Sequence, residues 1–81
     1  MALAARAADR DVCADYSRAA VRQFHEAQDH RRCHEFIRRD PNRWHGDFRA
    51  HFEWCRASPW GAVARERDLR RDALRECARG W

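Results

Sequence analysis

Four cysteines constrain the fold of this 81-residue chain more than any other feature. Cys13, Cys33, Cys55 and Cys77 are spaced by 20, 22 and 22 residues, and no two of them form a CxxC pair. Structural zinc sites and thiol redox enzymes use such close pairs, so neither is expected here. An even number of cysteines in a short chain instead predicts two disulfides, and therefore a periplasmic or extracellular location.

Four cysteines allow three pairings. The residue numbers of Cys13 and Cys77 add to nearly the same value as those of Cys33 and Cys55. Residues that face each other in an antiparallel helical hairpin have a nearly constant sum of residue numbers, so we favour the nested pairs Cys13–Cys77 and Cys33–Cys55. Twenty residues at 100° each place Cys13 and Cys33 about 200° apart on a straight helix. A first helix must therefore bend, end or unwind near Cys33.

The large apolar side chains are few. The chain has four Trp, four Phe, three Leu, three Val, one Ile and one Tyr, and β-branched residues are too scarce for strands. The sequence therefore predicts one small all-α domain over residues 1–81. Residues 1–8 are Ala-rich without the apolar segment of a secretory signal, and we expect them to be disordered or a processed remnant. No apolar run is long enough to cross a membrane, so membrane insertion is not expected.

Capping residues divide the chain into helices. Asp9 or Asp11 can cap a first helix, which must end before the turn Asp40-Pro41-Asn42. Asp47 can cap a short second helix in the connector. Ser58 can cap a third, with Pro59 at its first helical position and Gly80 as its stop. This order predicts an antiparallel helical hairpin with a short helix in the connector.

The basic character of the chain has two sources. All 17 basic residues are Arg, and with 15 Ala they indicate a GC-rich coding bias. In residues 65–68 and 71–72 the Arg residues alternate with acids, as on a solvated helix face with local ion pairs. A basic nucleic-acid-binding module is therefore a less favoured alternative.

Aromatic and basic residues gather in residues 33–60. They can fill the corner beside the hairpin, or they can form a contact surface for a protein partner, because Trp and Arg are enriched where proteins bind. We predict partner contacts at Arg43, Trp44, His45 and Trp60. Three other residues are assigned structural roles, in which Asp47 caps a helix, Trp54 packs, and His51 bonds back to the connector.

Five histidines suggest a metal-binding alternative. Glu26, His30 and His34 recur every four residues with Cys33 adjacent, while His45 and His51 lie across the turn. Two histidines at i and i+4 can chelate zinc, copper or nickel, but they also occur by chance on polar helix faces. We therefore predict no metal or other cofactor, and keep a His/Cys-based metal-binding protein as the alternative.

Catalytic motifs are missing from the sequence. It has no nucleophile elbow, no Gly-rich phosphate loop and no HExxH, and it contains two Ser and no Thr. We expect no enzyme activity.

One extended pattern is similar to that of a known group. Its central element is RWxxDxxxHxxWC, formed by residues 43–55 and flanked by the outer cysteines. Further matching residues are Tyr16, Ala20, Val21, Gln23, Glu66, Arg70 and Leu74. The pattern resembles a group of uncharacterised small bacterial secreted or envelope proteins. This resemblance implies export, two disulfides and a helical module. The expected function is thus a non-catalytic exported binding module or accessory subunit.

Overall fold

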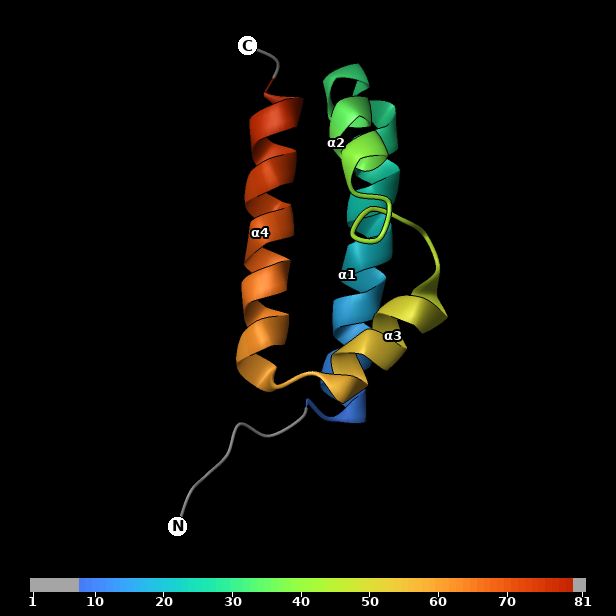
Figure 1. Ribbon diagram of the computed structural model, residues 1–81, viewed down its shortest axis with the longest axis vertical. Helices are drawn as coiled ribbons and strands as arrows, with labels where there is room; N and C mark the ends of the chain where they lie inside the picture. The colour runs from blue at the N-terminus through green and yellow to red at the C-terminus, as the bar shows by residue number, and fades with distance from the viewer. Residues whose placement is uncertain (1–7, 80–81) are drawn as a thin grey trace.

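The computed structural model describes residues 8–79, and this part of the chain is all-α (Figure 1). Its helices are α1 (Arg10–Asp29), α2 (His34–Arg39), α3 (Phe48–Ala57) and α4 (Trp60–Ala78), with a 3-10 turn η1 (Arg31–Cys33) between α1 and α2. No β-strand occurs within these residues, which confirms the predicted fold class. Residues 1–7 of the segment predicted to be a remnant, and Gly80, the predicted helix stop, lie outside the described residues. Ala8 is described, and it is buried.

Helix α1 begins where the sequence predicts. The Asp9 carboxylate accepts a hydrogen bond from the Val12 amide at 2.8 Å and satisfies a free N–H of the first turn. The helix ends at Asp29, and the chain continues through η1, whose last residue is Cys33. The α-helix is therefore interrupted just before Cys33, as predicted, although the nested pairing behind that prediction is wrong, as shown below.

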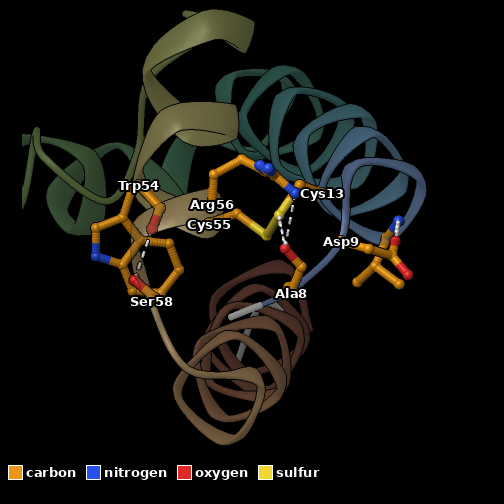
Figure 2. The surroundings of a disulfide bond; sticks show 8 residues. Ala8, Asp9, Cys13, Trp54, Cys55, Arg56 and Ser58 are labelled. Carbon is orange, nitrogen blue, oxygen red and sulfur yellow. Dashed lines mark hydrogen bonds between the residues drawn. A yellow bond between two sulfur atoms is a disulfide. The ribbon is translucent and has the colours of Figure 1, made fainter. Parts of the chain in front are cut away.

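Helix α3 is also capped as predicted, while the start of α4 differs from the prediction. The Asp47 carboxylate accepts from the Ala50 amide at 3.1 Å at the beginning of α3. Ser58 was predicted to cap the last helix, but its hydroxyl donates to the Trp54 carbonyl at 2.6 Å and so completes the end of α3 (Figure 2). Pro59 has extended backbone and precedes α4 without a side-chain cap. Two residues connect α3 to α4. The hydroxyl of the first, Ser58, is bound to α3 and therefore does not cap α4.

The helical hairpin is formed by α1 and α3. Cys13 near the start of α1 is joined to Cys55 near the end of α3, and Tyr16 lies beside His51. Further along α1, the Phe24 ring lies close to Gly46, just before α3 begins. As the residue number rises along α1, the residue number of its partner in or just before α3 falls. The two segments are therefore antiparallel. Helix α4 lies beside α1 and runs in the same direction, because the chain reverses again at Ser58 and Pro59 (Figure 1).

The predicted disulfide pairing is wrong. The bonds are Cys13–Cys55 and Cys33–Cys77, with Cα–Cα distances of 5.6 and 5.0 Å. The nested pairing assumed that the last helix runs antiparallel to the first. Because α1 and α4 run in the same direction, Cys33 just beyond the end of α1 meets Cys77 near the end of α4. The rule of constant sums applies to α1 and α3 instead, and there it matches Cys13 with Cys55.

Each disulfide lies in one of two core clusters. Cys13 and Cys55 pack with Tyr16, Val63 and Ala8. The second cluster contains Cys33, Cys77, Ala27, Trp44 and Leu74. Sulfur therefore supplies core volume in a chain with few large apolar side chains, and the two crosslinks add stability that burial alone provides poorly at this size. Two disulfides in a small helical protein indicate an oxidising, non-cytoplasmic compartment.

Candidate functional site

A cavity of about 280 Å³ lies where α1, α3, α4 and the connector before α3 meet. We call it the Arg70 cavity. The residues that define it are Tyr16 from α1, His51 and Trp54 from α3, Glu66 and Arg70 from α4, and Arg43 from the connector. These six residues all belong to the pattern that the sequence analysis singled out. They are up to 54 residues apart in the chain, from Tyr16 to Arg70, and the fold places them around one cavity.

Charged groups cross-link one side of this cavity. Arg43 binds Glu66 through two hydrogen bonds, from Nε to Oε2 at 2.6 Å and from Nη2 to Oε1 at 3.2 Å. The Arg43 guanidinium is also 3.6 Å from a carboxylate oxygen of Asp40. The hydrogen bond to Glu66 is the main reason that the pKa of Arg43 is raised above its ordinary value. This pair fastens the connector to α4.

Arg70 is the most deeply buried charge at the site. Its side chain is 4% exposed, and its Nη2 lies 3.7 Å from Glu66 Oε2, beyond hydrogen-bond distance. The guanidinium carbon lies 5.0 Å from the centre of the Tyr16 ring, which gives a cation–π contact. Within residues 8–79, no acceptor is hydrogen-bonded to Arg70 Nε or Nη1. A buried guanidinium with two unpaired nitrogens is costly, so the site holds unused hydrogen-bonding capacity.

Tyr16 contributes a second unpaired group. Its hydroxyl is buried and makes no hydrogen bond with the described residues, although its ring packs 5.6 Å from that of Trp54. Burial is the main cause that raises the pKa of this hydroxyl. The Arg70 guanidinium opposes the rise through its positive charge and its approach to the hydroxyl, although the two groups do not meet the geometry of a hydrogen bond. Tyr16 therefore remains a neutral phenol that can donate or accept.

Two histidines form the wall of the cavity nearest the start of α3. The rings of His45 and His51 stack with centroids 3.9 Å apart and planes 5° from parallel. His51 Nε2 donates to the His45 carbonyl at 2.9 Å, and His45 Nδ1 accepts from the Asp47 amide at 3.1 Å. These bonds assign the proton of His51 to Nε2 and leave His45 Nδ1 unprotonated. Burial, the largest influence, lowers the pKa of His51.

The structural roles predicted for these residues match their placement. His51 bonds back to the connector, Asp47 caps α3, and Trp54 packs on Tyr16 while remaining 42% exposed. Of the predicted contact residues, Arg43 and His45 line the Arg70 cavity. Trp60 is 44% exposed but lies outside the cavity lining, with Arg67 over its ring.

Trp44 requires a correction. Its predicted place is the contact surface, but it is 3% exposed and packs in the second core cluster. The turn of residues 41–43 directs the chain so that the Trp44 amide donates to the Asp40 carbonyl and the indole enters the core. A buried indole cannot present its face to a partner, so Trp44 is a core residue.

Arg70 belongs to the pattern quoted from the sequence, but its burial was not predicted. One signal was present, because the buried residues of α4 are Val63, Arg70, Leu74 and Cys77, spaced by seven, four and three. This is the spacing of a single helix face. An Arg at a core position of an otherwise regular stripe marks a buried charge.

The metal-binding alternative loses its thiol ligands, since all four cysteines are in disulfides. His34 Nε2 is hydrogen-bonded to the Gln28 carbonyl at 2.8 Å. Among residues 8–79, no group of three or more His, Cys, Asp or Glu side chains could hold a metal ion.

A larger open groove of about 850 Å³ runs between α1 and α4. Its lining includes Arg22, Glu26, Asp29 and Arg75, which are exposed and of mixed charge. It lacks the buried charge that distinguishes the Arg70 cavity.

In the described part of the chain, none of the helices has the length and apolar character needed to cross a membrane. A comparison with known proteins found no match to the chain among protein-family models, curated proteins or solved structures.

Proposed function

We propose that this protein is a non-catalytic binding module, exported to the periplasm or extracellular space, that serves as an accessory subunit of a larger assembly. Its protein partner contacts the mouth of the Arg70 cavity, where Arg43, His45 and Trp54 lie, and the exposed Trp60. The resemblance to small bacterial secreted or envelope proteins supports export, and the two disulfides support the same compartment.

The observation that carries the proposal is the exposure of Trp54 above a buried charge network. Trp54 is 42% exposed, although its ring packs on the buried Tyr16. Trp and Arg side chains held in place at the rim of a cavity are the residue types that contribute most to protein interfaces. Arg43 is fixed by Glu66, so little conformational entropy is lost when a partner binds.

The groups at the cavity support binding more than catalysis. His51 and His45 have hydrogen bonds to the backbone, and Arg43 is bound to Glu66. The cavity lining contains no Ser, Thr or Cys that could act as a nucleophile. Ion pairs of Arg71 with Asp68 and Asp72 on α4 reduce the positive field that nucleic-acid binding needs.

The test is a capture experiment with two matched variants on α3. Trp54→Ala removes an aromatic side chain at the cavity, and Phe48→Ala removes one of nearly equal exposure, 41%, outside the cavity lining. The disulfide-bonded protein is immobilised and exposed to the secreted or envelope fraction of its source. We expect one partner, retained by Phe48→Ala and lost by Trp54→Ala. A partner that both variants retain, or the absence of any partner, contradicts the proposal.

A further inference from the structure

Arg70 is buried without enough partners of its own. Its side chain is 4% exposed, and Nε and Nη1 have no hydrogen-bond acceptor within residues 8–79. Tyr16 lines the same cavity, and its buried hydroxyl also makes no hydrogen bond with the described residues. Unpaired buried donors each cost free energy, and a charged donor costs most. Two such groups at one cavity point to a ligand that brings acceptor oxygens.

The balance of charge favours an anionic ligand. Glu66 is the acid closest to Arg70, but it is already bound at two atoms by Arg43 and lies 3.7 Å from Arg70. Asp40 also lines the cavity, but its side chain is 43% exposed, so water screens its charge. The buried part of the cavity therefore has an excess of positive charge at Arg70.

The shape of the site limits the size of this ligand. A cavity of about 280 Å³ exceeds the roughly 150 Å³ that holds a benzene ring in a protein interior. It can accept a carboxylate with a small apolar group, which would lie against the Trp54 ring. Arg70 Nε, Arg70 Nη1 and the Tyr16 hydroxyl have no contact with solvent, so the Tyr16 ring must shift and the guanidinium must turn toward the cavity on binding. Its weak ion pair with Glu66, at 3.7 Å, opposes this rotation little.

We propose that the Arg70 cavity binds a carboxylate, with Arg70 as the charged donor and the Tyr16 hydroxyl as a second hydrogen-bonding group. This inference rests on the proposed binding function and names the chemistry of the group that is bound. The carboxylate belongs either to a small free acid or to the end of a partner chain, and the experiment distinguishes these sources.

The probe for the free acid is benzoate, with benzamide as a neutral match of the same shape. Benzoate is titrated into ¹⁵N-labelled protein while the Nε–H signal of Arg70 is followed by NMR. We expect a saturable shift of this signal. Benzamide should bind more weakly than benzoate by a factor of about ten or more, because a charged hydrogen bond is lost. The absence of a saturable shift, or equal binding of benzamide, overturns the proposal.

Three variants assign the binding to the cavity. Arg70→Gln should weaken benzoate binding by about tenfold or more, and Tyr16→Phe by about threefold to tenfold. Arg75→Gln removes an exposed charge from the same helix, outside the cavity lining, and should leave binding unchanged. Binding that survives Arg70→Gln overturns the proposal. If circular dichroism shows that Arg70→Gln does not fold, the wild-type Arg70 signal and Tyr16→Phe decide the outcome.

The source is identified with the tripeptide Gly-Gly-Phe, as the free acid and as the C-terminal amide. Tighter binding of the free acid than of benzoate, lost on amidation, assigns the site to a chain terminus. Binding of benzoate alone assigns it to a small free acid. A partner captured as before by a protein that binds no carboxylate overturns this inference and leaves the proposed function intact. Carboxylate binding without any captured partner supports this inference and contradicts the proposed function.

Discussion

The Glu66 carboxylate binds Arg43 through two hydrogen bonds, of 2.6 and 3.2 Å, across 23 residues of sequence. The same carboxylate faces the buried Arg70 at 3.7 Å. One acid therefore compensates two guanidinium groups that come from the connector and from α4. Its removal would leave Arg70 as a buried charge without a counter-ion, whereas removal of Arg43 would leave Glu66 paired with Arg70.

We therefore expect Glu66→Gln to lower the free energy of unfolding more than Arg43→Gln does. The expected losses are about 2–4 kcal/mol for Glu66→Gln and about 1 kcal/mol for Arg43→Gln, whose side chain is 34% exposed. Urea denaturation at neutral pH measures both. The control is Glu53→Gln on α3, which breaks an exposed ion pair with Arg49 and should cost less than about 0.5 kcal/mol. Equal losses for all three variants would contradict this account of the network.

Non-reducing peptide mapping should find Cys13 joined to Cys55 and Cys33 joined to Cys77. The bonds close loops of 42 and 44 residues, so the chain-entropy model assigns each about 4 kcal/mol. We expect the double variant Cys13→Ser/Cys55→Ser, and the matching Cys33→Ser/Cys77→Ser, each to lose a large part of the folding stability. Full reduction should unfold the protein, as measured by circular dichroism. A reduced protein that melts at the same temperature as the oxidised form would refute a stabilising role for the bonds.

The limits of the helices could be predicted because capping is a local interaction. Asp9 and Asp47 each accept a hydrogen bond from an amide three residues ahead, and both were recognised from sequence. The direction in which helices pack depends instead on how the chain turns between them. The residues between α1 and α2 and the two residues after α3 reverse the chain (Figure 1), and neither segment shows from its sequence how the next helix will pack. The disulfide prediction failed at that step.

The candidate site could be predicted in part for the same reason. Local roles were assigned correctly to His51 and Asp47, whose bonds stay within the turn before α3 and its first residues. Glu66 and Arg70 join the site only because α4 lies beside α1, so their partners could not be found from spacing within α4. Trp44 was misplaced because an aromatic residue in a turn can enter the core or face solvent, and tertiary packing decides between them.

Asp47→Ala should lower the free energy of unfolding by about 1 kcal/mol, because it removes the side chain that accepts from the Ala50 amide. Asp47→Asn keeps an acceptor oxygen at the same position and should retain most of the stability. Thermal denaturation followed by circular dichroism measures both. An Asp47→Asn protein as unstable as Asp47→Ala would show that the negative charge, and not the capping bond, is what α3 requires.

Stability should also fall in mildly acidic solution because of His51. Its pKa in the folded protein is lowered, mainly by burial, and the nearby charges of Arg70 and His45 add to this, while its bond to the His45 carbonyl and the charge of Asp47 oppose it. The unfolded chain, where the pKa of a histidine is about 6.5, then takes up a proton more readily than the folded protein. The contribution of neutral His51 to the free energy of unfolding is therefore intact above about pH 6.5, and it is lost as the pH falls from there toward the pKa of His51 in the folded protein.

Urea denaturation at a series of pH values between 5 and 8 tests this expectation. The wild-type free energy of unfolding should decrease as the pH falls below about 6.5. His51→Gln should flatten the decrease, because it removes the titrating ring. His25→Gln, which changes an exposed histidine of α1, should leave the decrease in place. A pH dependence unchanged by His51→Gln would refute the assignment of this transition to His51, whose stacked ring and backbone hydrogen bond would then tolerate the added charge.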